Sequence, residues 1–99
     1  MSVSYLLKAV TRDTEGVELV LRVVGTREPP AQMVIQIAIV GGASVQIQGR
    51  IARDAPWHNL GTALVASSLF HIEAVQFLRA VATGVAADAT VTAWAVWAW

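Results

Sequence analysis

Residues 33–51 read MVIQIAIVGGASVQIQGRI, and apolar residues recur at every second position in both halves of this segment. Successive side chains of a β-strand point to opposite faces, so this period predicts two strands that each bury one face. Polar or charged residues fill the alternate positions from Ser44 to Arg50, as in a strand with one face in water. Gly41 and Gly42 lie between the two strands and tolerate positive φ, so we expect the strands to pair as a β-hairpin.

The same alternation predicts strands over most of the chain. They are expected at residues 5–11, 17–24, 57–65, 69–74, 77–83 and 90–97. Turn signals recur about every 8 to 12 residues, which is typical of a sandwich or a barrel. Residues 73–82 contain alanines and Leu78, so a short helix is the alternative there. We predict an all-β chain in which residues 1–99 form a single antiparallel β-sandwich, jelly-roll-like or immunoglobulin-like, of about seven or eight short strands.

The composition provides more apolar surface than one small core can bury. Hydrophobic residues make up 56% of the 99 residues and charged residues 14%, compared with roughly 25% in ordinary soluble domains. Seven Lys and Arg balance seven Asp and Glu, which gives no electrostatic signal for nucleic acid or an anionic membrane and favours self-association. The most hydrophobic run, residues 33–40, is far shorter than the ~20 residues of a membrane-spanning helix. We expect no nucleic-acid partner, no membrane partner and, without signal-peptide features, synthesis in a cytoplasm.

No recognisable catalytic or metal-binding set is present in the sequence. The absence of cysteine excludes a disulfide scaffold and a thiolate zinc site. His58 and His71 are the only histidines, and neither shows a metal-ligand spacing to a carboxylate such as Asp54 or Glu73. No serine lies in a nucleophile-elbow context. We therefore expect no catalytic residue, no metal and no cofactor, and hence a protein that is not an enzyme.

Four tryptophans are the most informative side chains of the sequence. Trp97 and Trp99 share one face of the C-terminal strand, and Trp94 lies on the other. Three uses of these C-terminal tryptophans stay open: completing the domain's own core, contacting another subunit and stacking on a sugar. We take Trp94, Trp97 and Trp99 as interface candidates, because aromatic residues are enriched at the buried centres of interfaces. The sugar is the weakest use, because Asn59 is the only asparagine available to bind one.

Two further side chains are expected to be structural. Trp57 follows a proline and is expected to plug the end of the core. Arg79 lies within a predicted strand, and we expect its guanidinium to pair with a carboxylate or with carbonyls of a neighbouring strand. Phe77 and Val81 share the face of Arg79 and are expected to pack beside it.

Four segments after residue 42 follow one another in a characteristic order. They read ASVQIQG at 43–49, WHNLGT at 57–62, FLRAVAT at 77–83 and ATVTA at 89–93. A strand of the V-x-I-x-G kind thus precedes a tryptophan with Leu-Gly, an arginine-bearing strand and a final Thr-Val-Thr strand. This order resembles that of small β-sandwich structural proteins of tailed-bacteriophage virions.

The resemblance implies a non-enzymatic structural protein of the phage particle, located in the virion after synthesis in the host cytoplasm. The first role that it implies is a capsid decoration or cement protein present in several copies, and head-to-tail, tail or baseplate positions come next. Its partners would be a major capsid or tail protein and, as a homo-oligomer, further copies of itself. The same order of strand, tryptophan and strand occurs in discoidin-like and carbohydrate-binding sandwiches. A carbohydrate-binding or receptor-binding module is therefore the alternative.

Overall fold

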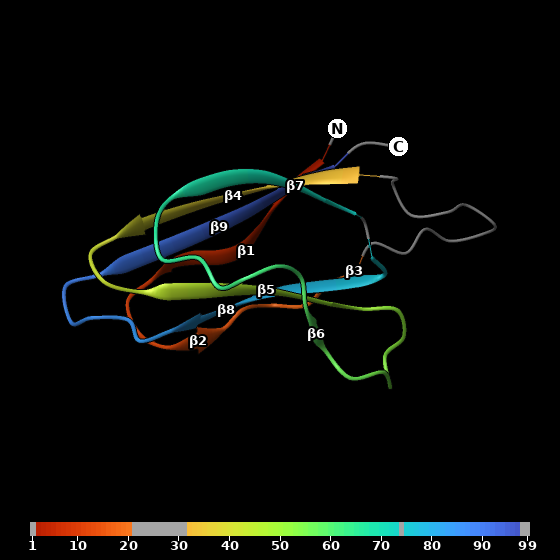
Figure 1. The fold of residues 1–99 in the computed structure, drawn as a ribbon, viewed down its shortest axis with the longest axis horizontal. Helices are drawn as coiled ribbons and strands as arrows, with labels where there is room; N and C mark the ends of the chain where they lie inside the picture. Colours follow the sequence, from red (N-terminus) through yellow and green to blue (C-terminus); the bar gives the residue numbers. More distant parts are fainter. Residues whose placement is uncertain (1, 21–31, 74, 98–99) are drawn as a thin grey trace.

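The computed structural model describes residues 2–20, 32–73 and 75–97, which form two antiparallel sheets packed face to face (Figure 1). This architecture confirms the predicted all-β sandwich, and none of the described residues belongs to a helix that could cross a membrane. Sheet 1 has the strand order β1-β9-β4-β7, and sheet 2 has the order β2-β8-β5-β6, with β3 also paired to β8. The nine strands formed by the described residues are β1 (Ser2–Val10), β2 (Thr14–Glu15), β3 (Leu19–Val20), β4 (Gln32–Val40), β5 (Ser44–Arg50), β6 (His58–Asn59), β7 (Ser68–Glu73), β8 (Phe77–Thr83) and β9 (Thr90–Trp97).

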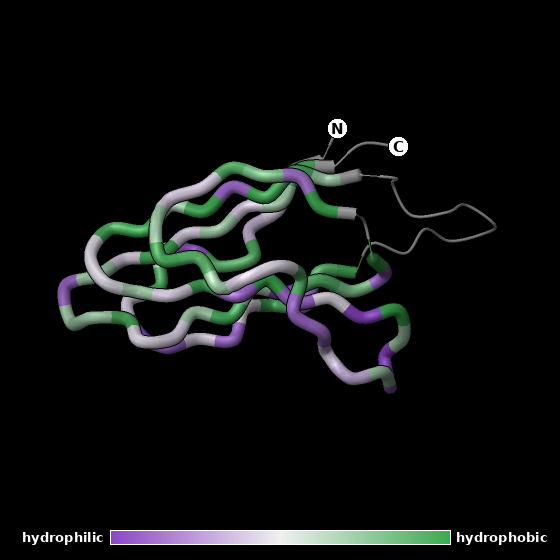
Figure 2. Tube along the Cα trace, viewed as in Figure 1, coloured by the Kyte–Doolittle hydropathy of each residue, from purple (hydrophilic) through white to green (hydrophobic). Residues whose placement is uncertain are grey.

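The core lies between the sheets and is built by the alternation seen in the sequence. Along the strands of Figure 2, green residues alternate with paler or purple ones. Small side chains in the central strands β8 and β9 leave room for larger ones on β1, β4 and β5, so the two layers interdigitate. The side chains that are at most 1% exposed include Leu6, Met33, Ile35, Ile37, Val45, Ile47, Leu78, Ala80, Ala82, Val91, Ala93 and Ala95.

The predicted hairpin between β4 and β5 is wrong. β4 pairs with β9 and β7 in sheet 1, whereas β5 pairs with β8 and β6 in sheet 2. Gly41, at φ +82°, and Gly42 form a corner that carries the chain from one sheet to the other. Alternation determines which face of a strand is buried. The apolar faces of β4 and β5 point into the same interior whether the two strands form a hairpin or a corner, so the alternation does not distinguish the two arrangements. The partner is decided by the long ladders available elsewhere, such as the eight residue pairs between β4 and β9.

Most successive strands change sheet, so strand neighbours are far apart in the sequence. β1 lies beside β9 at one side of sheet 1, with Ser2 opposite Trp97, and the two ends of the described chain therefore meet (Figure 1). β5 and β6, which follow one another along the chain, do pair with each other within sheet 2 (Figure 1). The fold consequently depends on contacts that form only when distant segments come together.

The predicted strand boundaries agree best near the C-terminus. β8 and β9 coincide with the predicted strands at 77–83 and 90–97, so the helix considered for residues 73–82 does not form in the described part of that segment. The strand predicted at 57–65 is reduced to β6 and a single bridge between Leu64 and Val45. Of the strand predicted at 17–24, only residues 17–20 lie among the described residues, and they contribute β3.

Candidate functional site

The outer face of sheet 2 carries a cluster of stacked cationic and aromatic side chains. The guanidinium carbons of Arg50 on β5 and Arg79 on β8 lie 4.3 and 4.4 Å from the centre of the Trp57 ring. Phe77, which is 5% exposed, lies beneath Arg50 and Arg53, whose guanidinium carbons are 5.5 and 5.4 Å from its ring centre. These contacts form a second small packed layer on the solvent side of sheet 2, in which each cation is held against an aromatic ring.

Arg50 and Arg79 also bind carboxylates, and Arg79 binds a glutamine amide. Arg50 Nη2 lies 2.6 Å from Glu18 Oε2, and Arg79 Nη1 lies 3.0 Å from Glu15 Oε2. Arg79 Nε also donates to Gln48 Oε1 at 2.8 Å. Each of the two cations is therefore paired with a carboxylate from the segment that runs along the edge of sheet 2.

The two residues expected to be structural both belong to this cluster. Arg79 has the expected carboxylate partner on a neighbouring strand. Trp57 does not plug the end of the core: it lies on the outer side of sheet 2, outside the hydrophobic cluster between the sheets. The reason is a turn after β5, in which Ala55 N donates to Ala52 O at 3.1 Å and directs the chain back over Arg50.

The outer face of sheet 1 has a different chemistry. The strand registers place Val3, Val96, Val34 and His71 in one row across the sheet, and Tyr5, Trp94, Gln36 and Leu69 in the next. These eight residues define the sheet 1 outer face. Val3 is 62% exposed and Leu69 is 69% exposed, so large apolar side chains remain in water at both sides of the face. On its β1 side the Tyr5 and Trp94 rings are 5.8 Å apart and inclined by 40°.

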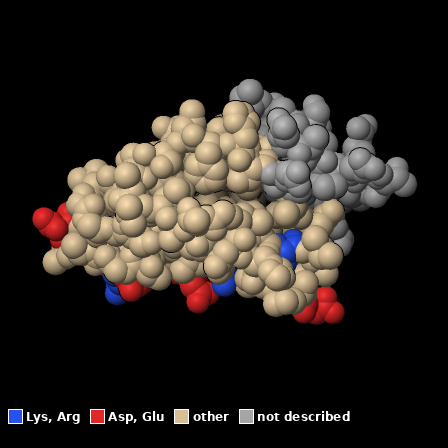
Figure 3. All heavy atoms as spheres, in the orientation of Figure 1, with Lys and Arg blue, Asp and Glu red and all other residues tan. Residues whose placement is uncertain are grey.

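Few of the described side chains on sheet 1 are charged. Among its described side chains, Lys8 is the only Lys, Arg, Asp or Glu, and its Nζ lies 5.2 Å from the centre of the Tyr5 ring at the margin of the face. In Figure 3 the charged atoms lie along sheet 2 and at the β8–β9 turn, while the atoms over β4, β7 and β9 are tan. The two outer faces of the sandwich therefore differ in their described side chains: sheet 2 carries ion pairs, and the eight residues that define the sheet 1 outer face include no Lys, Arg, Asp or Glu.

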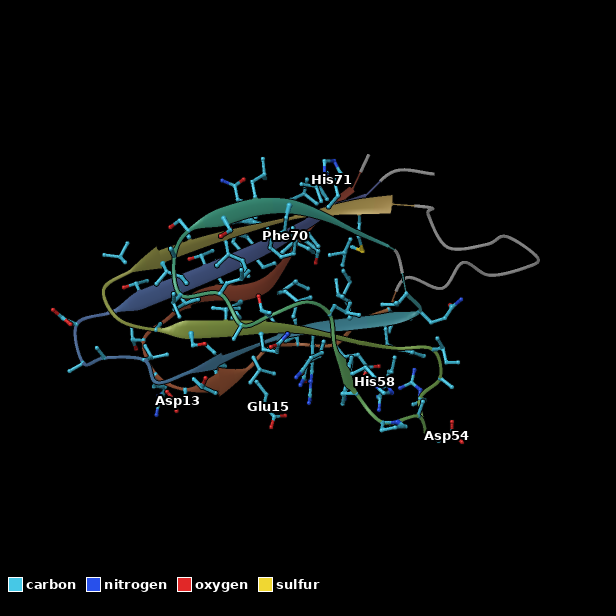
Figure 4. All side chains as sticks on the ribbon, viewed as in Figure 1. Asp13, Glu15, Asp54, His58, Phe70 and His71 are labelled. Carbon is cyan, nitrogen blue, oxygen red and sulfur yellow. The ribbon has the colours of Figure 1, made fainter. Side chains whose placement is uncertain are left out.

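The histidines belong to opposite layers of the sandwich. His58 lies on β6 of sheet 2, and His71 lies on β7 of sheet 1, pointing away from the interior that Phe70 enters (Figure 4). Within the described ranges no group of three or more His, Asp or Glu side chains could hold a metal ion. The fold thus brings neither histidine into a set of metal ligands in the part of the chain that is described.

A cavity of about 390 Å³ opens between the sheets on the side of β6 and β7. It is lined by Leu60, Gly61, Phe70, His71, Ile72 and Val75. His71 is the one titratable residue in this lining, so the described walls offer no pair of groups for acid–base chemistry.

The three interface candidates have different outcomes. Trp94 lies on the sheet 1 outer face, where it contacts Tyr5 and faces Gln36 on the neighbouring strand. Trp97 is the last residue of β9, but its side chain is outside the described part of the structure, and Trp99 lies outside the described residues. Sequence reasoning missed Val3, Tyr5 and Leu69 as members of this surface. Their alternation was visible, but only the pairing of β1 with β9 and of β7 with β4 places them on the same face as Trp94.

Comparison of the chain with known proteins finds no matching family model, no similar curated protein and no similar solved structure.

Proposed function

We propose that this chain is a non-enzymatic structural protein of a tailed-phage particle, where many copies attach to the shell as a capsid decoration or cement protein. The observation that carries the proposal is the sheet 1 outer face. Its eight residues include no Lys, Arg, Asp or Glu, and large apolar side chains such as Val3 and Leu69 are mostly exposed. A surface of this kind gains free energy when another protein covers it, by about 25 cal/mol for each Å² of apolar area removed from water.

The distribution of charge supports an assembly role in preference to a catalytic one. On sheet 2, Arg50 is bonded to Glu18, and Arg79 to Glu15 and Gln48, so these two cations are engaged by neighbouring side chains. An apolar face of modest size binds weakly by itself. Many copies on one particle turn such weak contacts into firm attachment, because each bound copy raises the effective concentration of the others.

The phage context comes from the resemblance of the segments at 43–49, 57–62, 77–83 and 89–93. In the folded chain, the first and third of these segments form most of β5 and all of β8, and the second begins at Trp57. Trp57, Phe77 and Arg79 of the second and third segments belong to the packed outer layer of sheet 2, whereas the fourth segment leads into β9 of sheet 1.

The carbohydrate-binding alternative has less support from the geometry. Sugar sites combine an available aromatic ring with free amide or carboxylate groups. Here the Trp57 ring is engaged by Arg50 and Arg79, and Gln48 both accepts from Arg79 and donates to Asn59 Oδ1 at 3.0 Å. The groups that a sugar would require on sheet 2 are thus bonded to one another.

Purified phage particles test the proposed function directly. Particles are banded by density from a lysate in which the chain is produced, and each protein is quantified by mass spectrometry. We expect the chain to co-purify in many copies per particle, while a non-structural phage protein from the same lysate is removed. If the chain remains with the free proteins and instead changes its tryptophan fluorescence on addition of glycans, the virion role is wrong and the carbohydrate-binding alternative replaces it.

A further inference from the structure

We infer that the sheet 1 outer face is a self-complementary surface on which a second copy of this chain docks, sheet against sheet, about a two-fold axis. The inference rests on the assembly role proposed above and names one partner for it. In such an isologous interface the same patch occurs on both sides, so residues near the axis meet their own counterparts. A surface suits this arrangement only if its groups can bind to copies of themselves.

The polar groups of the sheet 1 outer face satisfy this condition. The Gln36 amide and the His71 imidazole can each donate and accept a hydrogen bond, and so can the Thr90 hydroxyl on the same side of β9. Two copies can therefore pair these groups with one another. Charged groups would behave differently, because identical charges repel when they meet across a two-fold axis. Lys8, the one charged group described on sheet 1, lies at the margin, where water remains available to it.

The β1 edge of the sheet is less suited than the face to receive a second copy. β1 has register shifts between Tyr5 and Leu7 and between Leu7 and Val10, and Ala9 has φ +47°. Bulges and an exposed lysine such as Lys8 are devices that keep an edge strand from pairing with another chain. The irregular edge therefore favours association through the face of the sheet.

The size of the face predicts a weak and reversible dimer. Four strands at ~4.8 Å spacing and about eight residues at ~3.3 Å each give a face of roughly 500 Å² per copy. Two copies then bury roughly 1,000 Å², which is near the lower limit for a specific interface. We therefore expect a dissociation constant of roughly 1 to 100 µM, with the two sheets about 10 Å apart.

Analytical ultracentrifugation of the full chain over a hundredfold range of concentration tests the inference. Leu69→Lys adds a charge to the sheet 1 outer face at a side chain that is 69% exposed. Ile51→Lys is the matched control, since Ile51 is 77% exposed but follows β5 of sheet 2. Gln36→Glu is a third variant, nearly isosteric, which would place two like charges across the axis. Thermal melts confirm that each variant is folded.

We expect the wild type and Ile51→Lys to form the same dimer, and Leu69→Lys and Gln36→Glu to raise the dissociation constant about tenfold or more. A monomeric wild type at every concentration would overturn the inference, as would an assembly that Leu69→Lys leaves unchanged or that Ile51→Lys weakens equally. These results are separable from the particle experiment. A chain found in purified particles but monomeric in solution keeps the structural role and loses this interface, whereas a dimer that is absent from particles keeps the interface and loses the role.

Discussion

Arg50 and Arg79 each contact a carboxylate and an aromatic ring, and the Trp57 ring joins the two. Such a stack needs a flat cation, because a guanidinium covers a ring face while its edge still donates hydrogen bonds. The ion pair of Arg79 contributes little by itself, since Glu15 is largely exposed. The stacking on Trp57 and the hydrogen bond to Gln48 should therefore provide most of the stability that this arginine supplies.

Substituting Arg79 tests that account. We expect Arg79→Ala to lower the free energy of unfolding by about 1–3 kcal/mol, because it removes the stack and the hydrogen bond. Arg79→Lys should lose most of the same amount, because an ammonium retains the charge but not the plane. Arg12→Ala, in the exposed β1–β2 turn, is the control and should change stability by less than ~0.5 kcal/mol.

Urea unfolding followed by circular dichroism measures these differences. Full stability in Arg79→Lys would mean that the ion pair with Glu15 dominates, contrary to this expectation. Equal losses in Arg79→Ala and Arg12→Ala would show that the cluster does not stabilise the fold.

Among the elements, the corner between β4 and β5 shows most clearly how far the sequence predicts the fold. The two strands, their apolar faces and the positive φ of Gly41 were all predictable from residues 33–51. Their pairing was not, because strand partners depend on ladders formed with β7, β8 and β9. The residues that make up the sheet 1 outer face could not be predicted for the same reason. Trp94 could be placed on a strand face, but its neighbours Tyr5 and Gln36 come from segments far from it in the sequence.

A glycine comparison tests whether this corner is sterically fixed. Gly41 (φ +82°) and Gly84 (φ +61°) both adopt positive φ, so alanine at either position incurs the backbone strain of about 1 kcal/mol. A Cβ on Gly41 would also lie 3.0 Å from both Cα and Cβ of Ala89, whereas a Cβ on Gly84 meets nothing within 4 Å. We expect Gly41→Ala to be about 1–2 kcal/mol more destabilising than Gly84→Ala in a urea titration. Equal losses would indicate that the corner relaxes away from Ala89.

At the scale of the whole molecule, the two outer faces divide the chemistry of the sandwich. Sheet 2 holds the ion pairs and the stacked arginines, and sheet 1 presents an apolar face with Lys8 as its one described charge. A domain of about this size buries a limited fraction of its surface and is only moderately stable by itself. Covering the sheet 1 outer face with a second copy would add to that stability.

Linkage between folding and association makes this measurable. If native copies associate and unfolded chains do not, the melting temperature should rise with protein concentration. We expect this rise in the wild type and in Ile51→Lys, and a melting temperature independent of concentration in Leu69→Lys. Differential scanning calorimetry at several concentrations distinguishes the cases. A wild-type melting temperature that stays constant would contradict association through the native fold.

The amino-acid order alone determines that this chain is all-β, that it folds as a sandwich and which side of most strands is buried, because side chains on a strand alternate between two faces and apolar ones leave water. Only the tertiary structure decides that Gly41 and Gly42 turn a corner between sheets, that Trp57 stacks between two arginines outside the core, and that Val3, Tyr5, Leu69 and Trp94 share one surface. These features depend on which strands become neighbours. That choice is made by contacts between distant segments, which no local pattern of residues encodes.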